Sequence, residues 1–163
     1  MANIEDCLMT GFASGIVDQR GAGVLKVANT TIRNMSGSGV NINATKVMLS
    51  DVRVINAANG IVAGGASVAM MVSRSVIQDN SAAGLLVAVG QVDVDSSVIA
   101  HNGTGASVGG GATLRLSNSD VVFNTTGVSG TVNSYSNNRF VGNGAGGTIS
   151  AITPAGTTPS GQQ

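Results

Sequence analysis

The fold is decided by the stretch at residues 77–87, which reads IQDNSAAGLLV, because variants of it recur along the chain. An aliphatic residue opens the stretch, an asparagine follows two or three positions later, and a glycine leads into a second aliphatic segment. Similar stretches stand at 32–40, 54–61, 99–106 and 121–128. The opening residues are 22 or 23 positions apart, and Phe140 follows the last of them after 19. The chain is therefore built from internal repeats.

The period and composition of the repeat together select a strand-based solenoid. Paired-helix repeats need about 33 residues or more. Leucine-rich repeats need several leucines and a helical return segment, which these copies lack. Each copy is rich in Val, Ile, Ser, Thr, Asn and Gly, and these residues favour short strands and turns over helices. The sequence predicts an all-β fold: a single-chain right-handed parallel β-helix of about six to seven coils of roughly 22 residues, with three short strands per coil.

Three sets of aliphatic residues repeat in step and are predicted to form the inner walls of the solenoid. They occupy the inward positions of alternating strands, where side chains point to opposite faces in turn. The sets are Leu25/Val47/Met70/Val92/Leu114, Ile32/Val54/Ile77/Ile99/Val121 and Val40/Ile61/Leu85/Ala106/Val128.

Asparagines repeat at the same period and are predicted to build a structural ladder at a corner. Stacked asparagine amides can hydrogen-bond along the stack, and asparagine tolerates the left-handed backbone of a sharp bend. Gly84, in the same motif, is predicted to permit the bend. The ladder residues are Asn34, Asn56, Asn80, Asn102, Asn124 and Asn143.

The repeat defines one domain and a tail. Residues 1–152 are predicted to form the β-helix domain, and residues 153–163, with two prolines among Gly, Ser, Thr and Gln, a flexible or disordered C-terminal tail. Residues 4–8 match the second strand of a coil, with no helical cap before them. We therefore expect either that a segment preceding this end has been removed or that another subunit covers it.

Composition excludes several functions. Eight basic and eight acidic residues give zero net charge, so we expect neither nucleic acid nor a membrane surface as a partner. One cysteine, Cys7, and one histidine, His101, cannot make a typical zinc site, and we expect no metal and no cofactor. The N-terminus lacks the pattern of a signal peptide. The localisation is then cytoplasmic by default, or secreted or at the cell surface if a signal has been removed.

The recurring Asn-x-x-Gly-Val/Ile-x-Val pattern, the run at 116–119 (LSNS) and the run at 134–139 (SYSNNR) resemble bacterial right-handed parallel β-helix repeat proteins of the pectate-lyase-like superfamily. The closest resemblance is to uncharacterised members of alphaproteobacterial type. It covers the chain to about residue 150. The resemblance implies the fold, and it implies no single function because the superfamily includes lyases, hydrolases, epimerases, adhesins and structural domains.

Asp93 and Asp95 form the best carboxylate pair for glycoside hydrolysis, about 7 Å apart along one strand, with Arg115 one coil away. Resemblance to pectate lyases implies bound calcium and a basic residue, a role for which Arg115 is the candidate. Two acids are too few for a calcium site of six to eight oxygens. His101, one coil above Asp79, could orient a general base, although no nucleophile is specified beside it.

Outward strand positions carry apolar residues in adjacent coils at Met48 and Met71, and at Val62 and Leu86. Such positions predict a contact surface. The leading hypothesis is therefore a non-catalytic structural or assembly module that forms homo-oligomers through these patches or the uncapped first coil. The alternative is a β-helix that binds or processes carbohydrate.

Overall fold

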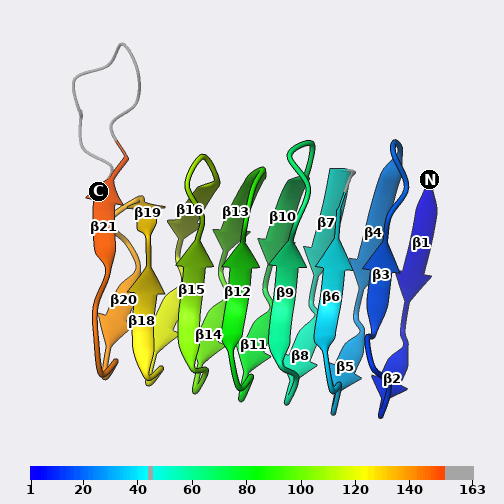
Figure 1. Ribbon diagram of the computed structural model, residues 1–163, viewed down its shortest axis with the longest axis horizontal. Helices are drawn as coiled ribbons and strands as arrows, with labels where there is room; N and C mark the ends of the chain where they lie inside the picture. Colours follow the sequence, from blue (N-terminus) through cyan, green and yellow to red (C-terminus); the bar gives the residue numbers. More distant parts are fainter. Residues whose placement is uncertain (44–45, 153–163) are drawn as a thin grey trace.

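The computed structural model describes residues 1–43 and 46–152, and these residues form a three-sided parallel β-solenoid of about six turns (Figure 1). The described part of the chain is all-β and has no helix. Each strand pairs in parallel with its equivalent one coil away. The repeated sequence thus forms repeated rungs, as predicted.

Three sheets, called A, B and C, form the sides of the solenoid. Sheet A contains β1 (Ala2–Glu5), β4 (Val24–Ala28), β7 (Lys46–Ser50), β10 (Ala69–Ser73), β13 (Gln91–Asp95), β16 (Thr113–Ser117), β19 (Thr131–Ser134) and β21 (Thr148–Ala151). Sheet B contains β2 (Leu8–Thr10), β5 (Thr31–Arg33), β8 (Arg53–Ile55), β11 (Val76–Gln78), β14 (Val98–Ala100), β17 (Asp120–Val122) and β20 (Arg139–Val141). Sheet C contains β3 (Ile16–Asp18), β6 (Ser38–Ile42), β9 (Asn59–Ala63), β12 (Ala83–Val87), β15 (Thr104–Val108) and β18 (Thr126–Ser129).

The three predicted inner walls are confirmed by the strand register. Met70 pairs with Val47 and Val92 in sheet A, and Ile77 pairs with Val54 and Ile99 in sheet B. In sheet C, Leu85 pairs with Ile61. These side chains belong to one continuous buried cluster. Burial of aliphatic surface, at about 25 cal/mol per Å², is therefore the main stabilising contribution to every coil.

Two corners of each coil follow the same rule: a residue with positive φ is followed by an inward side chain, which is polar in most coils. At the corner between sheets B and C, Asp79 has a φ of 56° and Asn80 is fully buried. At the corner between sheets A and B, Ser96 has a φ of 50° and Ser97 is buried. The left-handed residue makes the bend, and the next side chain replaces strand pairing with its own hydrogen bonds.

The six predicted ladder asparagines belong to two different ladders. Asn34 and Asn56 are the exposed, positive-φ residues of their corners, and Asn56 donates to Asn34 Oδ1 at 2.9 Å. Asn80, Asn102, Asn124 and Asn143 occupy the next, inward position. In the coils of Asn34 and Asn56 that inward position holds Met35 and Ala57.

Gly84 is required for space and not for the bend, which corrects its predicted role. The bend is made by Asp79, and Gly84 has no positive φ. A Cβ on Gly84 would lie 2.6 Å from Nδ2 of Asn102 in the next coil. Gly60 and Gly105 stand in the same relation to Asn80 and Asn124. The glycine of one coil therefore leaves the space that the asparagine of the next coil occupies.

The predicted start of the solenoid was wrong by one strand. Residues 2–5 form the first-strand rung β1, with Ile4 opposite Val27. The second-strand rung is β2, in which Met9, not Leu8, pairs with Ile32. The first coil is one residue longer than most, and this displaces the register inferred from spacing. Residues 153–163, predicted to form a flexible tail, lie outside the described residues. Among the described residues, no helix is long and apolar enough to span a membrane.

Candidate binding groove on sheet A

The two candidate aspartates lie in a groove on the outer face of sheet A. In β13, Val92 and Val94 point inward and are buried, so Asp93 and Asp95 point outward. The groove has a volume of about 620 Å³. It is lined by Met71, Asp93, Val94, Asp95, Arg115, Ser117, Asn118, Tyr135 and Asn137.

Asp93 and Arg115 form an ion pair across neighbouring strands. They are directly opposite in the register of β13 and β16, and Arg115 Nη1 lies 3.1 Å from Asp93 Oδ1. The Asp93 side chain is 52% exposed. Such a solvated pair contributes about 0.2–1 kcal/mol. Its main effect is to fix the positions of two charged groups that line the groove.

Asp95 is held in its ionised form by a set of hydrogen-bond donors. Ser117 Oγ donates to Asp95 Oδ1 at 2.6 Å and Asn118 Nδ2 donates to the same oxygen at 2.9 Å. Ser96 Oγ donates to Oδ2 at 2.9 Å. These donors lower the pKa of Asp95, with a further contribution from the charge of Arg74. Asp95 is therefore a fixed acceptor and not a proton donor.

The far side of the groove comes from the last coil, and the sequence prediction missed it. Tyr135 follows β19 and is 37% exposed. Asn137 accepts from the backbone N–H of Asn118 at 3.1 Å and donates to Asn118 Oδ1 at 2.8 Å. Tyr135 and Asn137 lie in the run at 134–139, which the sequence analysis used only for the family resemblance. The shortened repeat hid their alignment with the strands below.

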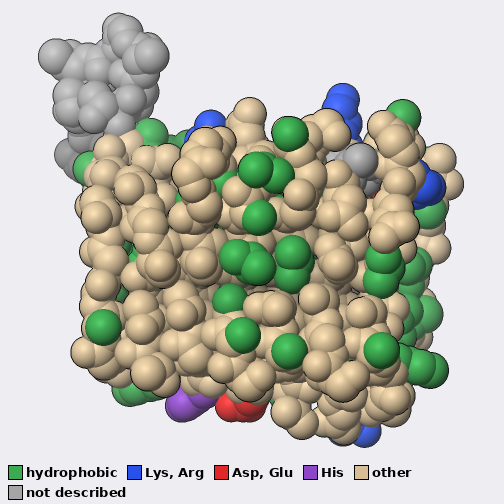
Figure 2. Space-filling view, in the orientation of Figure 1, with side chains coloured by type: hydrophobic (Ala, Val, Ile, Leu, Met, Phe, Trp, Pro, Cys, Tyr) green, Lys and Arg blue, Asp and Glu red, His purple; other side chains and the backbone are tan. Residues whose placement is uncertain are grey.

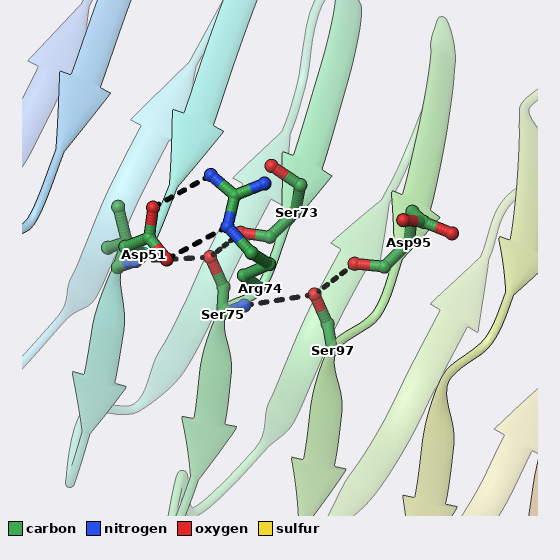
Figure 3. A network of polar contacts seen from close by, with 7 residues as sticks. Asp51, Ser73, Arg74, Ser75, Asp95 and Ser97 are labelled. Carbon is green, nitrogen blue, oxygen red and sulfur yellow. Dashed lines mark hydrogen bonds and ion pairs between the residues drawn. The ribbon is translucent and has the colours of Figure 1, made fainter.

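A ladder of buried serines hydrogen-bonds the backbone at the corner between sheets A and B, beside the groove (Figure 3). Ser97 Oγ accepts the backbone N–H of Ser75 at 3.1 Å and donates to the Asp95 carbonyl at 2.8 Å. Ser119 repeats this arrangement one coil further on. Outside the ladder, Arg74 pairs with Asp51 through two hydrogen bonds of 3.0 and 2.8 Å. This ladder anchors the backbone that carries Asp95, and it was not among the features predicted from the sequence.

The groove does not fit the calcium site that the pectate-lyase resemblance implies. Asp93 and Asp95 are its only carboxylates, and the protein already donates hydrogen bonds to one oxygen of Asp93 and to both oxygens of Asp95. Calcium takes six to eight oxygen ligands. Within residues 1–43 and 46–152, no three His, Cys, Asp or Glu side chains are grouped so that they could hold a metal ion.

His101 lies outside this groove, at the corner between sheets B and C. It lines a separate open depression with Asp79 and Phe123. Its ring stacks on that of Phe123, with centroids 5.6 Å apart and planes 20° apart. Both residues have positive φ. The structure thus places the histidine far from the Asp93–Arg115 pair in the fold, in a stack of aromatic rings.

The predicted contact residues lie on two different sheets. Met48 and Met71 are paired in register on the outer face of sheet A and are 51% and 44% exposed, and Met71 borders the groove. Val62 and Leu86 are paired in register on the outer face of sheet C, where both are half-buried.

A comparison with known families agrees with this architecture. A family model described as a right-handed β-helix region matches residues 1–151. No curated protein and no solved structure gives a significant match to the chain. The match spans all three sheets and every complete coil described above. The chain belongs to the right-handed β-helix family.

Proposed function

We propose that this chain is a non-catalytic β-helical module, of the bacterial pectate-lyase-like type, that binds a neutral carbohydrate in the groove on sheet A. The observation that carries the proposal is the composition of the groove. It presents one exposed aromatic ring, Tyr135, among polar side chains fixed on parallel strands. Carbohydrate sites combine an apolar ring surface with a few polar groups of fixed orientation.

Binding fits the groove better than hydrolysis does. Glycoside hydrolysis needs one carboxyl group that stays protonated, with a raised pKa, beside an ionised one. The pKa of Asp95 is lowered, and Asp93 is paired with Arg115. Both carboxylates are thus placed to accept hydrogen bonds from hydroxyl groups.

The charge of the groove favours a neutral ligand. Two aspartates and one arginine line it, and this excess of negative charge would repel a uronate polymer. The carboxylates do not make a calcium site that could reverse the effect. We therefore expect the ligand to be a neutral glycan whose hydroxyls contact Asp93 and Asp95 and whose ring packs on Tyr135.

The test is binding to an array of neutral and acidic glycans, followed by calorimetry with the best ligand. Tyr135→Ala should weaken binding about 3- to 10-fold, the equivalent of one aromatic contact, and Tyr135→Phe should retain most of it. Phe123→Ala, which removes an exposed ring in another part of the molecule, is the matched control. Preference for acidic glycans, or no binding at all, would refute the proposal.

Catalysis is tested separately. Lyase and glycosidase assays, with and without calcium, should show no turnover of the bound glycan. Turnover by the wild type that is lost in Asp93→Ala and Asp95→Ala would instead establish the polysaccharide-processing alternative.

Assembly is a second candidate role, favoured by the exposed apolar side chains outside the groove. Leu8 and Phe12 in the first coil are 61% and 59% exposed, and sheets A and C each carry an apolar pair in adjacent coils. Self-association through one of these surfaces predicts a molecular mass that rises with protein concentration in light scattering. A constant monomer mass would exclude this role and leave carbohydrate binding unaffected.

A further inference from the structure

One side of the solenoid, sheet C, carries no charged residue in its strands from β6 onward. Its first strand, β3, ends at Asp18, which forms an ion pair with Arg20. The strands β6, β9, β12, β15 and β18 of sheet C contain no Asp, Glu, Lys or Arg. The corners at 64–68, 88–90 and 109–112, which lead from sheet C to sheet A, also lack charged residues. Figure 2, which views sheet C from outside, shows basic and acidic side chains only at the margins of this face. The outer faces of sheets A and B, in contrast, carry charges such as Lys26, Arg53 and Asp120.

The centre of the uncharged face is apolar. Val62 and Leu86 lie side by side on β9 and β12, and Figure 2 shows hydrophobic side chains grouped over these two strands. Their neighbours in register are Asn41 on β6 and Ser107 on β15. The face thus has an aliphatic centre and small, uncharged polar flanks. Depletion of charge around an apolar centre is typical of protein interfaces.

We propose that a second copy of this chain covers sheet C, with the two sheets packed face to face about a twofold axis at roughly the 10 Å spacing of stacked sheets. This inference rests on the assembly role and names its surface. A twofold contact places a patch against its own copy, so the patch must be self-complementary. Charged positions near the axis would face like charges. An uncharged face with Val62 and Leu86 at its centre meets its copy without that repulsion.

The size of the face sets the strength of the contact. Strands of five residues span about 16 Å, and five of them at about 4.8 Å cover roughly 24 Å, so each copy contributes on the order of 400 Å² of projected sheet. Two copies together bury about 800 Å², which is below the standard size of specific interfaces and in the range of weak, transient ones. We therefore expect a weak dimer, populated at tens to hundreds of micromolar and dissociated at about 1 µM.

Sedimentation equilibrium from about 1 µM to about 1 mM tests the proposal over the range expected for an interface of this size. The wild type should shift from monomer to dimer. Leu86→Lys places two like charges near the axis and should weaken dimerisation at least about tenfold. Ser107→Lys, on the next strand, should weaken it without removing any packed side chain. Met48→Lys, which adds the same charge at an exposed position on sheet A, is the matched control and should dimerise like the wild type.

A charge-swap experiment tests the symmetry. Leu86→Lys and Leu86→Asp proteins should each be monomeric alone and should form a heterodimer when mixed. Circular dichroism and thermal unfolding of each variant establish that it is folded, and Ser107→Lys replaces Leu86→Lys if the latter is not.

The possible outcomes separate the two proposals. Dimerisation that survives Leu86→Lys and Ser107→Lys but is lost in Met48→Lys would overturn the sheet C interface and leave the assembly role intact. Dimerisation that survives in every variant would do the same. A wild type that stays monomeric at all concentrations would overturn both.

Discussion

The carbonyl oxygen of the Asn102 side chain accepts two hydrogen bonds from one residue of the adjacent coil. The backbone N–H of Asn80 donates to it at 3.0 Å and the side-chain amide of Asn80 donates at 2.9 Å. Asn102 in turn donates through Nδ2 to Asn124 Oδ1 at 3.0 Å and to the carbonyl of Ile77 at 3.2 Å. Each rung of this ladder satisfies the polar groups of the rung before it, in the interior of the protein.

Asn102→Ala should therefore be strongly destabilising. The substitution leaves the N–H and the amide of Asn80 buried without an acceptor, and each such loss costs about 1–3 kcal/mol. We expect the free energy of unfolding in urea to fall by roughly 2–4 kcal/mol.

Asn56→Gly is the matched control for Asn102→Ala. Asn56 is exposed with a φ of 55°, so glycine adopts its backbone freely and the change should stay within about 0.5 kcal/mol. Equal effects of the two substitutions would contradict a ladder that stabilises through its buried rungs.

Gly105→Ala should destabilise through steric overlap alone. The added Cβ would lie 2.6 Å from the carbonyl oxygen of Gly127 and 2.8 Å from Asn124 Nδ2. Overpacking of this kind costs about 1–3 kcal/mol. Gly110, where an added Cβ meets nothing within 4 Å, is the control, and Gly110→Ala should be neutral or slightly stabilising. Thermal unfolding of both variants checks the pair. A Gly105→Ala protein with an unchanged midpoint would show that the close fit to the asparagine ladder is unimportant.

Ser97→Ala should destabilise through the corner between sheets A and B. It removes the acceptor of the Ser75 N–H, which donates at 3.1 Å in a buried position. We expect a loss of about 1–3 kcal/mol in the free energy of unfolding, because the buried Ser75 N–H is left without its acceptor. Ser107→Ala, on the outer face of sheet C, should leave stability unchanged and controls for the loss of a hydroxyl. The idea fails if both variants unfold at the same urea concentration.

The stability of the protein should fall in acid, partly through Asp95. Its pKa is lowered from an ordinary value of 3.8, chiefly by the hydrogen bond from Ser117. Since the folded pKa is below the unfolded one, the stabilisation is present above about pH 4 and is lost as the pH falls through the folded pKa. The pKa values of Asp51 and Asp120 are lowered too, by Arg74 and Arg139, and add to the fall.

Ser117→Ala isolates the contribution of Asp95 to this acid dependence. The variant should be less stable than the wild type at pH 7, and the difference should shrink as the pH falls through the lowered pKa of Asp95, because below it the carboxyl is protonated in both proteins. Urea unfolding across this range measures it. A difference that is independent of pH would assign the effect of Ser117 to packing.

The repeat in the sequence was sufficient for the fold and the register of the inner walls. A period near 22 with aliphatic residues at fixed offsets leaves one way to bury them all, which is to stack equivalent strands in parallel. Where the period changes, the prediction lost accuracy. It misplaced the first coil by one strand and did not align Tyr135 and Asn137 with the groove, because spacing alone cannot locate an insertion or deletion within a coil.

The sequence by itself determined which residues recur, and recurrence determined the rungs of the solenoid. Only the tertiary structure decided what each polar rung does. Asn56 and Asn80 follow their aliphatic residues by two and three positions, and this difference of one position leaves the first in solvent and the second buried. At a corner, the residue with positive φ points its side chain outward, and the residue that follows it points its side chain inward. The structure likewise decided that the charged residues gather on sheets A and B and are absent from the strands of sheet C after β3. That arrangement depends on which strands share a sheet, and residues paired in a sheet are 17 to 24 positions apart in the sequence.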